Sequence, residues 1–295
     1  KINQSRRMAN QQSSGRAGRM AQRNEIASHL AALLAVDRFK DYGPNGLQVE
    51  GVPEVRRLVS GVTASLALIE AAVADGADAI LVHHGLFWRG QTGVITGWMR
   101  QRIAPLLTHG INLFAYHLPL DAHPTLGNNA QLGLRLGLAA DGRFGDQDLG
   151  CIGPAAGIDS AAALAQRVQL ALGRAPVLLP GDGRPLRRIA WCTGGAQGFF
   201  DGAIAAGADA YITGELSEPQ AHIARETGVA FLACGHHATE RFGAPAVGAH
   251  LAQQFGIAHR FIEIENPACS PANSAAKSMP SGTPSGPAAS PTRWR

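Results

Sequence analysis

The sequence predicts an α/β protein with two similar α/β domains that are related by an internal pseudo-repeat. Short apolar, β-branched runs alternate with helical patterns along the 295 residues, which is typical of parallel sheets covered by helices. The segment 76–82, Gly-Ala-Asp-Ala-Ile-Leu-Val, recurs at 207–213 as Gly-Ala-Asp-Ala-Tyr-Ile-Thr. With 45% hydrophobic and 16% charged residues, the chain can bury one large core or two modest ones.

The first α/β half is predicted over 22–137. A helical apolar pattern runs from Met20 to Phe39 and precedes a turn-rich link at 41–46. A βαβ unit follows, because strand patterns flank a helical one. In order, we expect a strand at 57–63, a helix at 66–75, a strand at 77–82, a helix at 99–109, a strand at 111–116 and a helix from Gly127 to about Leu136.

A small intervening segment is predicted at 138–187, where Gly and Pro are frequent and only 161–172 has a clear helical pattern. The second α/β half, 188–266, then repeats the first. Its expected elements are a strand from Arg188, a helix at 198–206, a strand in the recurring segment, a strand at 229–234, a helix at 241–254 and a strand at 260–264. The basic tail 1–21 and the Ser/Pro/Ala-rich tail 267–295 are expected to be disordered.

The positive charge of the chain lies in its tails. Residues 1–23 and 267–295 carry nine basic residues and no acidic one, which leaves seventeen basic against twenty-two acidic residues between them. A nucleic-acid-binding face needs a basic stripe, so nucleic-acid binding through the core is not expected. There is no run of eighteen apolar residues, no export signal and no CxxC spacing, so we expect a cytoplasmic protein that does not bind membranes.

Two adjacent histidines, His83 and His84, follow the strand predicted at 77–82. In open α/β sheets, ligands gather beyond the carboxyl ends of the strands. Neighbouring strand residues point to opposite faces, so both can serve one site only if the chain turns at Gly85 or if two neighbouring metal ions each bind one of them. Taken alone, the pair is equally compatible with two solvated loop histidines.

A histidine and a carboxylate stand four residues apart after equivalent strands in the two halves. They are His117 with Asp121 and His236 with Glu240, and we expect both pairs on loops. A single pair of this kind is usually a surface pair, and His237 could be the ligand in place of His236. Recurrence of the same spacing in both halves favours one shared cleft.

The predicted cleft contains imidazole and carboxylate side chains, which suit Zn, Fe, Mn, Ni or Co. Five or six such ligands are too many for one tetrahedral ion, so their number predicts two divalent metal ions per chain, in a dinuclear metal cleft between the halves. A carboxylate can bridge two ions about 3.5–4 Å apart, and a metal-bound hydroxide between them can attack phosphorus or carbon at neutral pH.

Eight stretches of the chain closely resemble the dinuclear-metal family labelled GTP cyclohydrolase 1 type 2. They are 41–51, 61–65, 76–85, 117–124, 127–131, 190–195, 212–215 and 235–240, and the resemblance covers residues 22–267. It implies metal ligands at His83, His84, Asp121, His236 and Glu240, with Glu240 as the bridge. It also implies that His117 is a near neighbour rather than a ligand, either a catalytic group that passes a proton or a group that supports the ligands. It further implies that the chain forms a ring-shaped homohexamer whose sites face an internal cavity.

The resemblance implies a metal-dependent hydrolase of a nucleotide-like substrate, with GTP opened at its imidazole ring. The chain has no Walker-type phosphate loop, and a nucleotide phosphoester hydrolase using the same hydroxide is the nearest alternative. A further alternative is a hexameric metal-binding scaffold without turnover, whose ions would be coordinatively closed. A nucleic-acid-binding ring is supported only by the basic tails.

Overall fold

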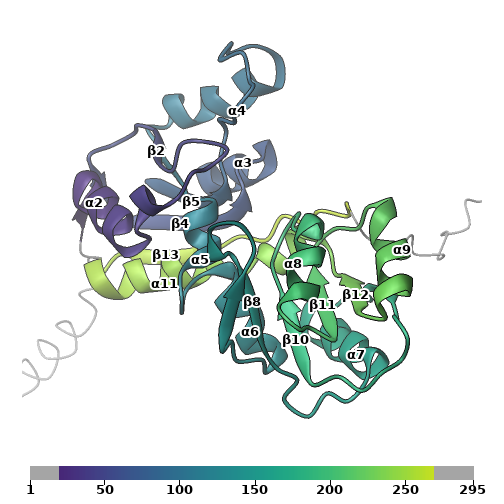
Figure 1. Cartoon of the computed structure of the whole chain (residues 1–295). Coiled ribbons are helices and arrows are strands. Elements are labelled where there is room, and N and C mark those ends of the chain that lie inside the picture. Colours follow the sequence, from purple (N-terminus) through teal and green to yellow (C-terminus); the bar gives the residue numbers. More distant parts are fainter. Residues whose placement is uncertain (1–19, 269–295) are drawn as a thin grey trace, which may run out of the picture.

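Residues 20–268 are described by the structure, a computed structural model, and they form two lobes that each contain one large sheet (Figure 1). The mixed α/β fold expected from the sequence is confirmed. The two predicted disordered tails lie outside the described residues, apart from 20–21 and 267–268. Within 20–268, no helix is long and apolar enough to cross a membrane.

Ten α-helices and thirteen strands occur in the described part of the chain. The helices are α2 (Arg23–Leu33), α3 (Leu66–Ala74), α4 (Gly97–Thr108), α5 (Leu118–Ala122), α6 (Asn128–Leu136), α7 (Ala161–Leu172), α8 (Phe200–Ala205), α9 (Glu218–Thr227), α10 (His236–Glu240) and α11 (Gly243–Phe255). The strands are β1 (Ala21–Gln22), β2 (Gly46–Val49), β3 (Glu54–Val55), β4 (Arg57–Thr63), β5 (Ala79–His84), β6 (Asn112–Ala115), β7 (Gly142–Phe144), β8 (Gly150–Pro154), β9 (Val177–Leu179), β10 (Arg188–Trp191), β11 (Ala210–Thr213), β12 (Ala230–Ala233) and β13 (Ala258–Phe261).

The first lobe is built on a five-stranded sheet with the order β13-β4-β5-β6-β2. Its strands pair in parallel, except that β2 runs antiparallel to β6. Ile80 and Val82 of β5 pack on one face with the apolar residues of α3 and α4, whereas Ala79 and Leu81 pack on the other face with those of α2 and α11. The sheet is therefore buried on both faces, as its almost continuous apolar strands require.

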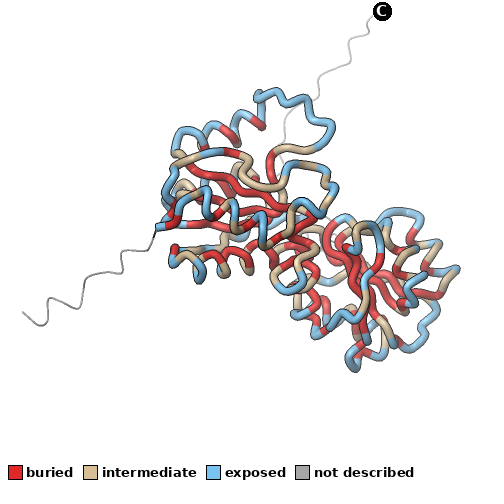
Figure 2. Tube along the Cα trace, turned by 60° about the vertical axis from the view of Figure 1, so that its left-hand side comes forward, coloured by how far each residue is buried: buried red, intermediate tan, exposed pale blue. Residues whose placement is uncertain are grey.

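The second lobe is built on a six-stranded sheet with the order β7-β8-β10-β11-β12-β9. Its three central strands, β10 to β12, are parallel, and the outer strands run antiparallel to their neighbours. Helices α6 and α7 pack on one face around Trp191, and α8 and α9 pack on the other around Tyr211. Figure 2 shows buried residues along the strands of both lobes and exposed residues on the outer surfaces.

The central strands of the two lobes have the same arrangement. In each lobe a helix follows the first strand and another follows the second, giving β4-α3-β5-α4-β6 and β10-α8-β11-α9-β12. All neighbouring strands within these two runs are parallel. The internal pseudo-repeat that the recurring segment suggests stays a prediction.

Sheet membership differs from the predicted division of the chain at two points. The predicted second half contains β13, but this strand pairs with β4, and α11 packs on the first sheet (Figure 1). The predicted intervening segment contains β7, β8 and β9, which all belong to the second sheet. These strands have three to five residues each, too few for a strand pattern to stand out between Gly and Pro residues.

Two short helices, α5 and α10, follow β6 and β12 where the sequence predicted loops. That prediction is wrong, because Pro119 lies in the first turn of α5, where a missing backbone N–H does no harm. His236 and Glu240 lie in α10 four residues apart, a spacing that places two side chains on one helical face. His117 directly precedes α5 as its N-cap, and Asp121 lies within that helix.

Candidate metal centre

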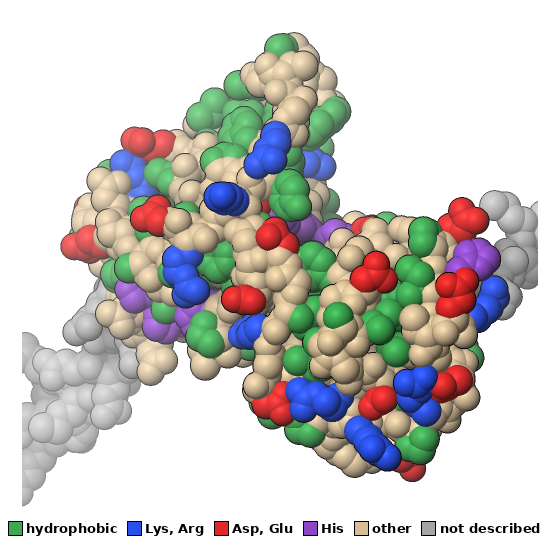
Figure 3. Space-filling view, viewed as in Figure 1, with side chains coloured by type: hydrophobic (Ala, Val, Ile, Leu, Met, Phe, Trp, Pro, Cys, Tyr) green, Lys and Arg blue, Asp and Glu red, His purple; other side chains and the backbone are tan. Residues whose placement is uncertain are grey.

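The five predicted metal ligands lie together at the junction of the two lobes. His83 and His84 end β5, Asp121 is on α5, and His236 and Glu240 are on α10. Histidine side chains are visible at this junction in Figure 3. The ligand atoms of these five residues and of His117 form three groups, and within each group all atoms lie within 4.8 Å of one another. The groups are His83, Asp121 and Glu240; His84, His236 and Glu240; and His83, His84 and His117.

Each of the two strand histidines has one ring nitrogen engaged by its own lobe. His83 is fully buried, and its Nδ1 donates a hydrogen bond to the carbonyl oxygen of Tyr116 at 3.0 Å. His84 Nδ1 lies 3.1 Å from Thr63 Oγ1. These contacts leave Nε2 of both rings for an ion, and the ring centroids are only 4.5 Å apart although the residues alternate along the strand.

Glu240 places one carboxylate oxygen near each of two histidine groups. Its Oε1 lies 3.3 Å from His83 Nε2. Its Oε2 lies 3.3 Å from His84 Nε2 and 3.1 Å from His236 Nε2. The residue is 2% exposed, so water does not compete with these contacts. A carboxylate in this position has the geometry needed to bridge two ions.

Asp121 is held in place by two buried side chains, those of Asn128 and Thr193. Its Oδ1 lies 3.6 Å from His83 Nε2. Asn128 Nδ2 donates a hydrogen bond to this oxygen at 2.9 Å, and Thr193 Oγ1 donates another at 3.2 Å. Neither residue was predicted as a site residue, although both lie in stretches that carry the family resemblance.

His236 is oriented by Glu215. The Nδ1 of His236 donates a hydrogen bond to Glu215 Oε1 at 2.6 Å, and Gln197 Nε2 donates to the other oxygen of Glu215 at 3.3 Å. Glu215 was not predicted as a site residue. The recurring segment contains the signal that could have identified it, because Glu215 occupies in the second copy the place that His84 has in the first.

His117 forms a dyad with Asp41. Asp41 Oδ1 accepts a hydrogen bond from His117 Nδ1 at 2.7 Å, and Asp41 Oδ2 accepts one from the backbone N–H of Leu118 at 2.9 Å. The His117 side chain adjoins both strand histidines, with ring centroids 5.0 Å from His83 and 5.8 Å from His84. In the neutral ring the hydrogen bond to Asp41 favours the tautomer with the proton on Nδ1, which leaves the Nε2 lone pair for a proton or an ion.

Burial and neighbouring charges shift the pKa values of the cluster. Burial opposes protonation of His83, but the two carboxylates of the cluster outweigh it and raise its pKa to about 9. Burial likewise opposes protonation of His236, whose pKa Glu240 and Glu215 raise to about 9. Burial lowers the pKa of His84 to about 3, so this ring is neutral at pH 7. Glu240 is buried too, yet the histidines hold its pKa well below the usual range.

The residues present fit a metal site better than a set of ordinary hydrogen bonds. His83 Nε2 and Glu240 Oε2 are buried and have no well-directed hydrogen-bond partner within the described residues, although charged neighbours surround them. Buried polar atoms without partners are costly in a folded protein, and an ion between them removes that cost. Gly194 allows this close packing, because a Cβ at its position would lie 2.0 Å from Glu240 Oε1.

A cavity of about 330 Å³ opens beside the cluster. Asp121, His236, Glu240 and His117 contribute to its lining, so a bound molecule would contact both the ligand cluster and the dyad. Its other lining residues are Tyr42, Leu118, Asp146, Leu149, Cys192, Thr193, Gly195, Ala196, Gly198 and Phe199. The volume is within the range of about 300–1,000 Å³ that is usual for small-molecule sites.

Sequence comparison finds close bacterial relatives. A protein of Pseudomonas aeruginosa named GTP cyclohydrolase 1 type 2 homolog is 53% identical over 234 residues, which are 78% of this chain and 92% of the relative. The protein of the same name from Escherichia coli K12 is 49% identical over 238 residues, or 78% of this chain and 93% of the relative.

Structural comparison and a family model agree with these relatives. A solved structure titled "protein ybgI, unknown function" matches with a TM-score of 0.81 and 45% identity, covering 84% of this chain and all of that one. The family model described as Duf34/NIF3 (NGG1p interacting factor 3) matches residues 21–267, which include both lobes and every residue of the cluster. The chain therefore belongs to the DUF34/NIF3 family, whose bacterial relatives include the proteins named GTP cyclohydrolase 1 type 2 homolog.

Proposed function

We propose that the chain is a dinuclear divalent-metal-dependent hydrolase of a nucleotide-like substrate. The observation that carries this proposal is the position of Glu240, whose two oxygens face different ligand groups. Oε1 lies near Nε2 of His83, in the group that also contains Asp121, whereas Oε2 lies near the Nε2 atoms of His84 and His236. One ion in each group would share the carboxylate as a bridge.

The donor set agrees with this assignment. Three imidazoles and two carboxylates suit Zn, Fe, Mn, Ni or Co, and do not select among them. When bound, two such ions supply a water-derived nucleophile at neutral pH and neutralise negative charge that develops on the substrate. The side chains of Asn128, Thr193 and Glu215 keep the ligands oriented.

The Asp41–His117 dyad supplies acid–base chemistry beside the ligands. Asp41 is ionised at neutral pH: burial opposes its charge, but hydrogen bonds from His117 and Asn45 lower its pKa to about 2. It therefore keeps the proton of His117 on Nδ1, and Nε2 takes a proton from the attacking water and passes it to the leaving group. His117 lines the cavity, as this role requires.

A nucleotide-like substrate is supported by the relatives' names and by the cavity. GTP is the substrate that the name of the bacterial relatives suggests. The aromatic residues Tyr42 and Phe199 line the cavity together with the candidate metal ligands Asp121, His236 and Glu240. A planar base can therefore pack beside the site of attack. The homohexameric ring implied by the sequence resemblance belongs to the same proposal, with the sites facing its internal cavity.

Metal content per chain tests the proposal. Protein purified without chelator is expected to hold about two transition-metal ions per chain by elemental analysis. His84→Ala and Glu240→Ala are expected to lose one or both of them, because each removes a ligand of one group or the bridge between both. His222→Ala, which changes an exposed histidine on α9, is the matched control and should retain full occupancy.

Turnover then separates the hydrolase from a scaffold. Wild-type protein is screened with GTP and other nucleotides, and the products distinguish ring opening from phosphoester cleavage. Full metal occupancy with no hydrolysis of any nucleotide would favour the metal-binding scaffold. Less than one ion per chain, unchanged by either substitution, would overturn the site assignment itself.

A further inference from the structure

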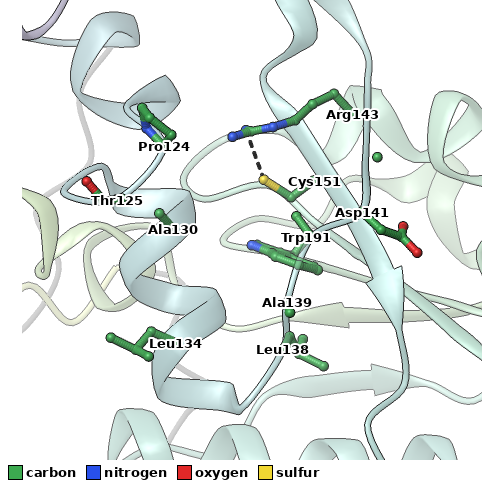
Figure 4. A pocket seen from close by; sticks show the side chains of 12 residues that line it. Pro124, Thr125, Ala130, Leu134, Leu138, Ala139, Asp141, Arg143, Cys151 and Trp191 are labelled. Atoms are coloured by element: carbon green, nitrogen blue, oxygen red, sulfur yellow. Dashed lines mark hydrogen bonds between the residues drawn. The ribbon is translucent and has the colours of Figure 1, made fainter.

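A second cavity, of about 620 Å³, lies between α6 and the strands β7 and β8 (Figure 4). It shares no lining residue with the cavity at the metal centre. Its size is within the usual range of about 300–1,000 Å³ for sites that bind small molecules. The lining residues are Pro124, Thr125, Ala130, Leu134, Leu138, Ala139, Ala140, Asp141, Gly142, Arg143, Cys151 and Trp191.

Most side chains that line this cavity are apolar. Trp191 and Cys151 lie at its inner side and are buried, and Ala130 and Leu134 line it from α6. Leu134 is 71% exposed, so most of this large apolar side chain is open to solvent. A molecule with an apolar body would cover this surface and gain the hydrophobic contribution to binding.

Arg143 brings a positive charge to the same cavity. Figure 4 shows its side chain reaching from β7 across the cavity above Cys151, and its Nη1 donates a hydrogen bond to Cys151 Sγ at 3.0 Å. A thiol is only a weak acceptor. No carboxylate within residues 20–268 forms an ion pair with Arg143, whereas the nearby Asp141 is already paired with Arg188 at 2.5 Å.

We propose that this cavity is a second ligand site, which takes a small amphipathic carboxylate. The apolar body of the ligand would lie against Leu134 and Trp191, and its carboxylate would accept hydrogen bonds from the guanidinium of Arg143. Guanidinium and carboxylate match in geometry and charge, so the carboxylate replaces the thiol as the better acceptor. Because Arg188 neutralises Asp141, the charge left at the cavity is positive.

Calorimetric titration of the full chain with decanoate tests this site. Decan-1-ol and decylammonium carry the same apolar body with a neutral or a positive head group. Decanoate is expected to bind saturably and about tenfold more tightly than decylammonium. Arg143→Ala is expected to weaken decanoate binding about tenfold, the usual effect of losing a charged hydrogen bond, and to leave the affinity for decan-1-ol unchanged.

Two matched controls keep the test specific. Arg225→Ala removes an exposed arginine of α9 outside the cavity and should leave decanoate binding unchanged. Leu134→Glu puts a negative charge on the cavity wall and should weaken decanoate binding at least as much as Arg143→Ala. Leu170→Glu makes the same change on α7, at a leucine that is 80% exposed and outside the cavity, and should have no effect.

Three results would overturn the proposal. The first is no saturable binding of decanoate to the wild-type chain. The second is equal binding of decanoate and decylammonium, since it would leave Arg143 without a role. The third is a combination of two findings: the wild-type chain does not bind decanoate, and Leu134→Glu changes the oligomeric state measured by light scattering. That result would assign the surface to contact between copies of the chain. All variants alter exposed residues, and circular dichroism checks that they remain folded.

Discussion

Asp41 Oδ1 lies 2.7 Å from His117 Nδ1 although 76 positions separate the two residues in the chain. The contact joins the turn-rich link before β2 to the start of α5. It fixes both the tautomer and the orientation of a histidine that lines the cavity at the candidate metal centre. The side chain of Asp41 is only 4% exposed, so the pair is protected from competing water.

Replacement of Asp41 by Asn should reduce turnover without reducing metal content. The variant loses the negative charge that holds the proton on His117 Nδ1, and groups of this kind usually change activity by about 10- to 100-fold. Turnover is measured with the nucleotide found in the substrate screen, and the His117 tautomer is measured by nitrogen NMR. Asp37→Asn, at an exposed aspartate, is the control. An unchanged tautomer together with unchanged turnover would remove the dyad from the proposed chemistry.

Replacement of Gly194 by Ala should damage the metal centre. Gly194 has φ +71°, and an added Cβ would lie 2.0 Å from Glu240 Oε1, so the carboxylate must move. Gly207→Ala is a matched control, because Gly207 has φ +84° but no heavy atom within 4 Å of its added Cβ. Both variants carry the backbone cost of about 1–2 kcal/mol, and only Gly194→Ala should add about 1–3 kcal/mol of overpacking.

Urea unfolding of metal-free protein measures the free energies of these two glycine variants, and elemental analysis measures their metal content. We expect loss of metal from Gly194→Ala alone. Equal destabilisation and equal metal content in both variants would contradict the close packing of Gly194 against Glu240.

Replacement of Asn128 by Ala should weaken both stability and metal binding. Its Nδ2 donates to Asp121, and its Oδ1 accepts from the backbone N–H of Gly243 at 2.8 Å, so the variant removes hydrogen bonds from two buried groups. The expected loss of unfolding free energy is about 2–4 kcal/mol, measured with urea. Metal affinity should fall about 10- to 100-fold. Asn24→Ala, at an exposed residue of α2, should stay within about 0.5 kcal/mol of wild type; a similarly small effect of Asn128→Ala would argue against its role.

Metal binding should release protons at pH 7. Without an ion the pKa values of His83 and His236 are raised to about 9, so below that pH both rings are positively charged and carry a proton on each nitrogen. An ion that binds their Nε2 atoms must displace these protons. The affinity for Co²⁺ should therefore rise as the pH increases from 6 to 9 and level off above 9.

Calorimetry in two buffers with different heats of ionisation counts the protons released on addition of Co²⁺. We expect about two per chain at pH 7 for the wild type and about one for His236→Ala. An affinity that does not change with pH, together with no proton release, would show that the ion does not displace the protons of these two histidines.

Local sequence patterns predicted the buried elements well. Strand β4 and helix α7 have the bounds expected from the sequence, because each combines a regular apolar pattern with a clear stop signal. The strands β7 and β9 were missed, since three residues are too few for an alternating pattern. Helices α5 and α10 were expected as loops, because one helical turn has no apolar period of its own.

Two features of the candidate site can be read from the sequence alone: two histidines at the end of an apolar strand, and two pairs in which a histidine and a carboxylate are four residues apart. The position of Glu240 between His83 and His84, and the hydrogen bonds from His117 to Asp41 and from His236 to Glu215, become visible only in the folded chain. Apolar periodicity and spacing are local properties of the chain, so they can be read directly. Contacts across the junction depend on how two sheets pack, and on the return of α11 and β13 to the first sheet, which no local pattern encodes.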